Sequence, residues 1–238
     1  MLLAVEELHA HYGKSHILHG VSLQIDAGEI VCLLGRNGVG KSTTLKSIMG
    51  LVRPSRGRVL FKERAIEGLP PYRVARLGLG YVPEERRIFP TITVRENLLM
   101  GIKGTRAGNG ARENGWTLER VYEFFPRLKE RERQRAGTLS GGEQQMLTMG
   151  RTLMGNPDLL LVDEPTEGLA PMIVEQVERI LQAIHAGGTP VLLVEQSMET
   201  ALALAERVYV MSKGQIVFQG SVRELQESDT VRKQYLEV

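Results

Sequence analysis

Hydrophobic residues in this chain fall into runs of two kinds. Residues 30–34 and 159–162 are continuous aliphatic runs, whereas residues 21–26 alternate between apolar and polar positions. A continuous run is typical of a parallel strand buried on both faces, and alternation is typical of an antiparallel strand with one face in water. The pattern therefore predicts a buried parallel sheet and, between residues 3 and 26, short antiparallel strands.

Short apolar runs alternate with helical patterns over most of the chain. Helices are predicted near residues 43–49, 72–77, 172–186 and 198–206, with a polar helical tail at the end. The other predicted strands cover residues 57–62, 79–82, 191–194, 208–211 and 215–218. Parallel strands alternating with helices predict an α/β core with right-handed crossovers.

The middle of the chain has a different, mainly helical pattern. Helices are predicted near residues 94–100, 116–125 and 142–154, and the Gly/Asn-rich residues 104–115 predict a mobile surface loop. The mixed charges of residues 127–135 predict a solvated helix face. We therefore predict one domain over residues 1–238, in which a helical subdomain at about 84–155 is inserted into a core made of about 1–83 and 156–238.

The first chemical motif lies between a predicted strand and a predicted helix. It fits the pattern G-x-x-x-x-G-K-[ST] and consists of Gly35, Arg36, Asn37, Gly38, Val39, Gly40, Lys41 and Ser42, followed by Thr43. In such a loop backbone N–H groups close around phosphates, the lysine charge reaches the β and γ oxygens, and the hydroxyl binds Mg²⁺. The motif predicts a nucleotide site, and its spacing argues against dinucleotide binding.

Two carboxylates follow the second continuous apolar run. Asp163 and Glu164 end the predicted strand just before Pro165, which cannot continue the ladder of hydrogen bonds. Buried carboxylates are costly unless a metal or a water network uses them. We expect Asp163 to hold Mg²⁺ and Glu164 to act as the general base on the water that attacks the γ-phosphate.

A second glycine-rich turn opens the helix predicted at residues 142–154. Its residues are Ser140, Gly141, Gly142 and Glu143, preceded by Leu139. Backbone amides beside glycines, a serine hydroxyl and a helix N-terminus together suit a phosphate group. A chain with two phosphate sites either folds them together or offers one of them to a partner.

Composition narrows the functional classes. The 30 basic and 28 acidic residues give a formal charge of +2, so nothing demands a nucleic-acid partner. The single cysteine, Cys32, lies in an apolar strand and predicts a reducing compartment. The sequence shows neither a signal peptide nor an apolar run long enough to span a bilayer.

The three motifs, in this order, resemble those of the ATP-binding cassette (ABC) ATPases over essentially the whole chain. The resemblance implies ATP and Mg²⁺ as cofactors, a P-loop NTPase core, and a head-to-tail dimer with a second homologous ATPase or a second copy. In that dimer Ser140, Gly141, Gly142 and Glu143 contact the partner's ATP. The resemblance also implies stacking of Tyr12 on adenine, two membrane permease subunits, indirectly a solute-binding protein, and a peripheral location at the cytoplasmic face of the inner membrane.

Three positions depart from the usual ABC residues. Glu84 replaces a glutamine that senses the γ-phosphate, Gln196 replaces a histidine that contacts the attacking water, and Ala170 replaces an aspartate. Glu84 can still bind the metal through water, and Gln196 can donate a hydrogen bond but cannot pass on a proton. We expect both side chains at the ATP site.

These departures occur together with further similarities, at residues 125–128 and 134–147, to one branch of bacterial importers. The branch is that of the second ATPase of the branched-chain amino-acid system. Two alternatives remain open at this point: an ATPase of a urea or short-amide importer, and an ABC ATPase outside transport. The second lacks support, because the chain has one cassette and no heptad run between its nucleotide motifs.

Overall fold

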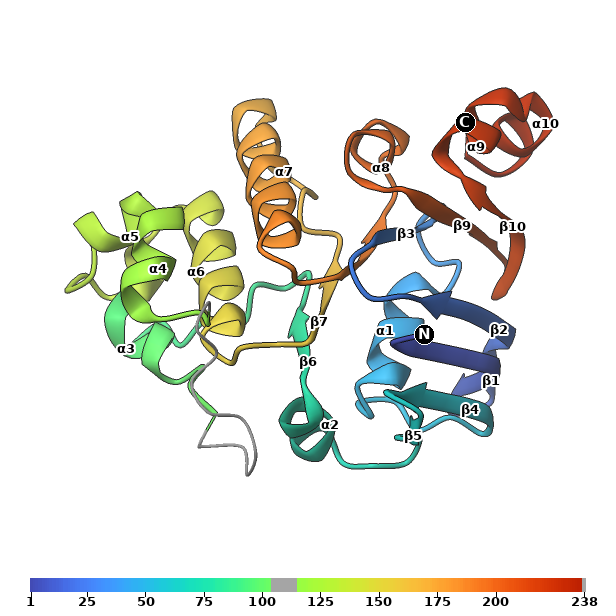
Figure 1. The fold of residues 1–238 in the computed structure, drawn as a ribbon, viewed down its shortest axis with the longest axis horizontal. Helices are drawn as coiled ribbons and strands as arrows, with labels where there is room; N and C mark the ends of the chain where they lie inside the picture. The colour runs from blue at the N-terminus through green and yellow to red at the C-terminus, as the bar shows by residue number, and fades with distance from the viewer. Residues whose placement is uncertain (104–114, 237–238) are drawn as a thin grey trace.

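The computed structural model describes residues 1–103 and 115–236. Two sheets lie side by side, and a group of helices lies at the end of the molecule opposite the smaller sheet (Figure 1). Apart from Gly115, the surface loop predicted at residues 104–115 lies outside the described residues.

The larger sheet forms the centre of the molecule and has the strand order β10-β9-β3-β8-β7-β6. All pairings are parallel except that of β10 with β9. Every residue of β3, β7 and β8 is buried, which confirms the prediction from the continuous apolar runs. The strands are β3 (Ile30–Leu34), β6 (Leu79–Val82), β7 (Leu159–Asp163), β8 (Val191–Glu195), β9 (Arg207–Ser212) and β10 (Gln215–Ser221).

The smaller sheet is antiparallel, with the order β2-β1-β4-β5. Its strands are β1 (Leu3–Tyr12), β2 (Ser15–Ile25), β4 (Arg56–Phe61) and β5 (Arg64–Ala65). The first two have 10 and 11 residues, so the prediction of short strands was wrong here. Register shifts between β1 and β2 break the simple alternation, because a bulge lets a strand continue while its pairing shifts.

The helices follow the predicted segments with two exceptions. Helix α8 ends at Leu204, not at residue 206, because the next residue is extended and Glu206 N–H donates to Ile30 O at 3.0 Å. Helix α5 covers only the start of the predicted charged helix, because Val94 N–H donates to Gln134 O at 3.0 Å and residues near 135 pair with the start of α3. The longer helices are α1 (Lys41–Ile48), α2 (Pro71–Leu77), α3 (Val94–Leu99), α4 (Leu118–Phe124), α5 (Pro126–Glu130), α6 (Gly141–Leu153), α7 (Pro171–Ala186), α8 (Met198–Leu204) and α9 (Val222–Glu227). A short helix α10 (Asp229–Val231) and a π-helical turn (Arg232–Leu236) end the described chain.

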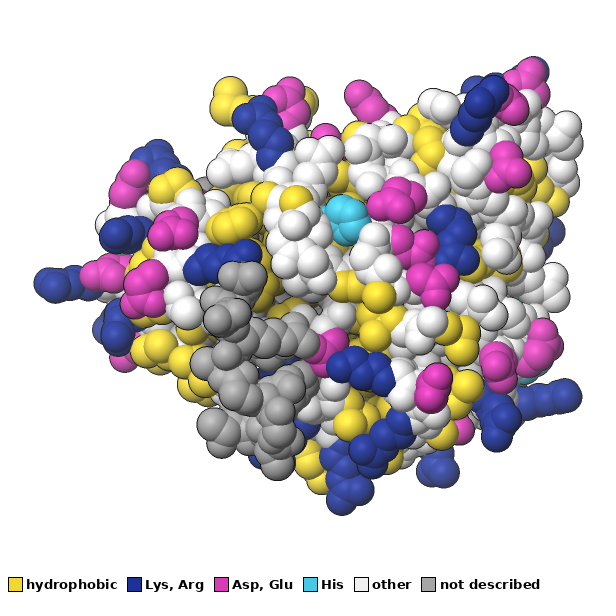
Figure 2. All heavy atoms as spheres, viewed as in Figure 1, with side chains coloured by type: hydrophobic (Ala, Val, Ile, Leu, Met, Phe, Trp, Pro, Cys, Tyr) yellow, Lys and Arg dark blue, Asp and Glu magenta, His cyan; other side chains and the backbone are white. Residues whose placement is uncertain are grey.

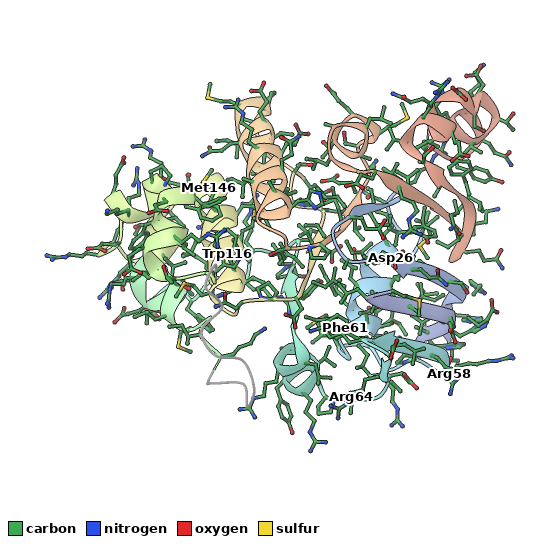
Figure 3. The ribbon with its side chains drawn as sticks, in the orientation of Figure 1. Asp26, Arg58, Phe61, Arg64, Trp116 and Met146 are labelled. Atoms are coloured by element: carbon green, nitrogen blue, oxygen red, sulfur yellow. The ribbon has the colours of Figure 1, made fainter. Side chains whose placement is uncertain are left out.

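The central sheet separates two hydrophobic clusters. Alternate residues of β3 enter different clusters: Cys32 packs with helices α3 to α8, and Leu33 packs with α1 and the antiparallel sheet. In Figure 3, Trp116 and Met146 mark the helical cluster and Phe61 marks the other. Cys32 is fully buried, as expected of a small core residue.

Acidic and basic side chains are interspersed on the face shown in Figure 2. This agrees with the small net charge. Among residues 1–103 and 115–236, no helix has the length and apolar character needed to cross a membrane.

Candidate nucleotide-binding site

The phosphate loop, residues 35–42, connects the end of β3 to the start of α1. Gly38 and Gly40 have φ angles of 78° and 112°, which side chains with a Cβ rarely adopt. A Cβ on Gly35 would lie 2.5 Å from Met211 O, so the loop also needs glycine for space. Arg36 and Asn37 are exposed at its tip, whereas Val39 packs against the core.

Lys41 is held inside this loop. Its Nζ donates to Gly35 O at 2.8 Å and to Arg36 O at 3.0 Å, and it lies 3.0 Å from Glu164 Oε1. The exposed fraction is 3% for Lys41 and 8% for Glu164, so the ion pair is buried. The two charges neutralise each other in a site with little water. Any phosphate that binds Lys41 therefore competes with Glu164.

Tyr12 lies beside the phosphate loop although the sequence separates them widely. A pocket of about 200 Å³ is lined by Tyr12 and Ile17 from the antiparallel sheet and by Gly38, Gly40, Lys41, Ser42, Thr43 and Glu164. The Tyr12 side chain is half exposed. An aromatic ring in this position can stack on a base whose phosphates enter the loop.

Asp163 lies at the carboxyl end of β7 and has no exposed surface. Tyr81 Oη donates to its Oδ2 at 2.8 Å, and its Oδ1 is buried without a hydrogen-bond partner. Burial raises the pKa of Asp163, and hydrogen bonds from the hydroxyls of Tyr81 and Ser42 oppose that rise. The structure thus brings the phosphate-loop serine to the aspartate.

A second pocket, of about 350 Å³, lies beside Glu164 and is lined by polar residues. It is lined by Glu164, Thr166, Glu167, Glu195, Gln196 and Ser197. A hydrogen bond with Glu164, together with burial and the nearby charges of Glu164 and Glu84, raises the pKa of Glu167. Gln196 therefore lines the same pocket as Glu164, and Glu84 lies close to Glu167.

The serine-glycine turn begins helix α6. Ser140 is the N-cap, and a capping box joins it to Glu143: Glu143 N–H donates to Ser140 Oγ at 3.4 Å and Ser140 N–H donates to Glu143 Oε2 at 2.9 Å. Arg131 Nε lies 2.8 Å from Glu143 Oε1. Figure 1 shows β6 and β7 between α6 and α1, so the turn and the phosphate loop lie in different parts of the molecule.

Comparison with known proteins agrees with this geometry. A family model described as "ABC transporter" matches residues 18–167, more than half of the chain. The chain belongs to the ABC transporter ATPases. It is therefore an ATP-binding and ATP-hydrolysing subunit, and the predicted fold class is confirmed.

Individual relatives match this ABC ATPase over almost its full length. The high-affinity branched-chain amino acid transport ATP-binding protein BraG of Pseudomonas aeruginosa is 43% identical, with 99% of each chain covered. The lipopolysaccharide export system ATP-binding protein LptB of Escherichia coli is 32% identical, with 98% and 96% covered. The structure of the ADP conformation of MJ1267, an ATP-binding cassette of an ABC transporter, is 26% identical with a TM-score of 0.81, covering 98% and 97%.

The residues of this ABC ATPase fit a magnesium ion bound together with nucleotide. Asp163 Oδ1 is a buried acceptor without a donor, and the Ser42 hydroxyl lies close enough to the same carboxylate to lower its pKa. In the described residues no three His, Cys, Asp or Glu side chains are grouped to hold a metal by themselves. Mg²⁺ in nucleotide sites keeps waters and uses substrate phosphates, so one or two protein ligands suffice.

Glu195 is a buried carboxyl beside the site, and its protonation is expected to make the stability of the protein depend on pH. Its carboxylate is 3% exposed and accepts from Thr166 Oγ1 at 2.8 Å and from Gln196 N–H at 3.1 Å. Burial nonetheless raises its pKa above the usual value of 4.5. The folded chain therefore holds this proton more tightly than the unfolded chain does. As pH rises from about 4.5 through the folded pKa, the proton is lost and the free energy of unfolding falls.

We therefore expect Glu195→Gln to gain stability relative to the wild type as pH rises through that window. Urea denaturation from pH 4 upward measures the difference in free energy of unfolding. Glu199→Gln, at an exposed position on α8, is the control for replacing a carboxylate by an amide. A difference for Glu195→Gln that does not change with pH would contradict the raised pKa.

Sequence reasoning missed three polar side chains near the site. Tyr81 bonds to Asp163, Glu167 lies close enough to Glu164 for its pKa to rise, and Thr166 bonds to Glu195. No spacing in the sequence could have revealed the contacts of Tyr81 and Glu195, because their partners lie on other strands or loops. Glu167 follows Glu164 closely, and a second carboxylate at that distance was the only available signal.

Proposed function

We propose that this chain is an ATPase subunit that energises a bacterial importer of branched-chain amino acids. Identity of 43% to BraG over 99% of both chains carries the proposal, and the 32% identity to LptB is lower. Glu84, Ala170 and Gln196, which depart from the usual residues, favour the same branch. A urea or short-amide importer is the second candidate.

In this proposal one ATP lies along the phosphate loop. Lys41 leaves Glu164 and binds the β and γ oxygens, the backbone of the loop surrounds the phosphates, and Tyr12 stacks on adenine. The pocket shared by Tyr12 and Lys41 supports this orientation. The residues in contact with this ATP are Tyr12, Gly35, Arg36, Asn37, Gly38, Val39, Gly40, Lys41, Ser42, Thr43 and Glu84.

Glu164 is the general base in this mechanism. Its carboxylate accepts a proton from the water that attacks the γ-phosphate, and ADP and phosphate leave. Gln196 orients that water through its amide but cannot take up the proton. Asp163 and Ser42, with Glu84 through water, would hold Mg²⁺, which would neutralise charge developing on the phosphates.

The turn at residues 140–143 serves a partner's ATP in this proposal. Its separation from the phosphate loop supports this, because Ser140 begins a helix on the far side of β6 and β7 (Figure 1). A homologous ATPase or a second copy then packs head to tail. Helices α3 to α6, within the proposed helical subdomain of residues 84–155, move with this turn.

A surface groove supports contact with two membrane permease subunits. It has a volume of about 360 Å³ and is lined by apolar Met49, Leu79, Phe89 and Met100 and by basic Lys103 and Arg151. Phe89, Met100 and nearby Ile102 are 45%, 63% and 53% exposed, and a protein partner accounts for such exposure better than water does. Docking there gives a peripheral location at the cytoplasmic face of the inner membrane, and a solute-binding protein is a partner only indirectly, through the membrane subunits.

Purification of the tagged chain from membranes tests the assembly. We expect two permeases and a second ATPase to co-purify, while the Lys41→Ala variant remains bound to them because the groove is separate from Lys41. Uptake of labelled leucine and urea in a strain that lacks the chain then tests the cargo. Loss of leucine uptake supports the proposal, and loss of urea uptake alone would contradict it.

The glutamine at position 196 predicts an unequal pair of ATP sites. If Gln196 limits hydrolysis at this chain's own site, Gln196→His should raise turnover of the assembled transporter, because histidine can accept a proton. Phosphate release by the complex measures this, with Gln215→His, at an exposed position on β10, as the control. An unchanged rate for Gln196→His would remove functional support for the asymmetry.

A further inference from the structure

Tyr81 connects the candidate magnesium site to the surface groove. Its hydroxyl donates to Asp163 Oδ2 at 2.8 Å, and the residue lines the groove together with Leu79 and Phe89. Tyr81 is not among the residues to which the resemblance to ABC ATPases assigned a role. The side chain is part-buried, and its hydroxyl is the donor in this hydrogen bond.

The register of the central sheet creates this contact. Tyr81 on β6 lies opposite Leu161 on β7, so Asp163, two positions later, is the diagonal neighbour on the same face. Long side chains reach each other across such a diagonal. Thr152 Oγ1 on α6 also donates to Tyr81 O at 3.3 Å, which fixes the backbone of the tyrosine.

The hydrogen bond from Tyr81 makes the two carboxylate oxygens of Asp163 inequivalent. Oδ2 is occupied by the Tyr81 hydroxyl, whereas Oδ1 is buried without a partner. A carboxylate held at one oxygen cannot rotate freely about its side-chain bonds. The remaining oxygen is thereby kept in one direction, which suits a small cation with strict octahedral geometry.

We propose that Tyr81 is a positioning residue that orients Asp163 toward the Mg²⁺ of bound Mg·ATP. The inference rests on the proposed role of Asp163 in holding that ion. Partners that orient a metal ligand typically change metal affinity by about 10–100-fold when they are removed. Because Tyr81 also lines the groove proposed above as the docking surface, a membrane subunit docked there would lie beside the residue that orients the aspartate.

Tyr81→Phe tests the proposal, because it removes the hydroxyl and keeps the ring. The purified chain is titrated with Mg²⁺ in the presence of a fluorescent, non-hydrolysable ATP analogue, and the half-effective Mg²⁺ concentration is read from the fluorescence. We expect it to rise about 10-fold. Affinity for the analogue in excess chelator should match the wild type, which also shows that the variant is folded.

Tyr209→Phe is the matched control. Tyr209 is buried and its hydroxyl accepts from Gln24 N–H at 3.1 Å. The variant therefore also removes a hydrogen-bonded tyrosine hydroxyl, but one that does not contact Asp163. It should leave the Mg²⁺ requirement unchanged. In the assembled transporter, Tyr81→Phe should raise the Mg²⁺ concentration for half-maximal turnover and nearly regain kcat at saturating Mg²⁺.

Two outcomes separate the inference from the function on which it rests. If the wild type responds to Mg²⁺ and Tyr81→Phe responds at the same concentration, the role of Tyr81 is overturned and that of Asp163 stands. If the wild type binds the analogue without any response to Mg²⁺, both roles are overturned.

Discussion

Glu164→Gln should lower ATP turnover by about 10²–10⁴-fold, because the amide cannot accept the proton of the attacking water. The same change should strengthen ATP binding roughly five-fold, equivalent to about 1 kcal/mol. The reason is the 3.0 Å ion pair between Glu164 and Lys41, which ATP must displace in the wild type. Phosphate release by the assembled transporter and binding of a fluorescent ATP analogue measure the two effects.

The variant should also accumulate an ATP-bound dimer with its partner, detectable by size-exclusion chromatography. Glu175→Gln is the matched control, because Glu175 is exposed on α7 and pairs only with nearby Arg179 among the described residues. Glu175→Gln should change neither the ATP turnover nor the affinity for the ATP analogue. Undiminished turnover in Glu164→Gln would rule out Glu164 as the general base, and unchanged affinity would show that the ion pair does not oppose ATP.

Lys41→Ala should weaken ATP binding by about 100-fold or more, since about 2.7 kcal/mol corresponds to that factor and several charged hydrogen bonds are lost. It should also destabilise the nucleotide-free protein by about 3 kcal/mol, because Glu164 would remain buried without its partner. Equilibrium binding and urea denaturation measure these two losses.

The double variant Lys41→Ala/Glu164→Gln separates the two effects of the lysine. Stability should largely return, because no unpaired carboxylate remains, whereas ATP binding should stay weak. Lys14→Ala, in the exposed turn between β1 and β2, is the control for removing a lysine near the site. Wild-type ATP affinity in Lys41→Ala would contradict the assignment of the phosphate loop.

Local motifs account for the parts of the site that were predictable. The phosphate loop and the Asp163–Glu164 pair each follow a buried strand, and the chemistry of each resides in neighbouring residues. The ends of β3 and β7 meet at the same edge because both strands are parallel in one sheet, separated only by β8. Ser42 could therefore be expected near Asp163.

Helix boundaries were less predictable where tertiary contacts intervene. The charged segment after residue 126 has a helical pattern, but residues 131–135 turn to bond with the start of α3. Likewise α8 ends early because Glu206 joins β3 through its backbone. In both places a nonlocal hydrogen bond replaces the helical one that the local sequence favours.

The sequence by itself determined which residues could bind phosphate, hold a metal and accept a proton, because these abilities depend on residue type and on neighbours along the chain. Only the tertiary structure decided that Lys41 pairs with Glu164, that Tyr12 shares their pocket and that Tyr81 holds one oxygen of Asp163. These contacts depend on strand order and register, which arise from packing the whole chain around two cores.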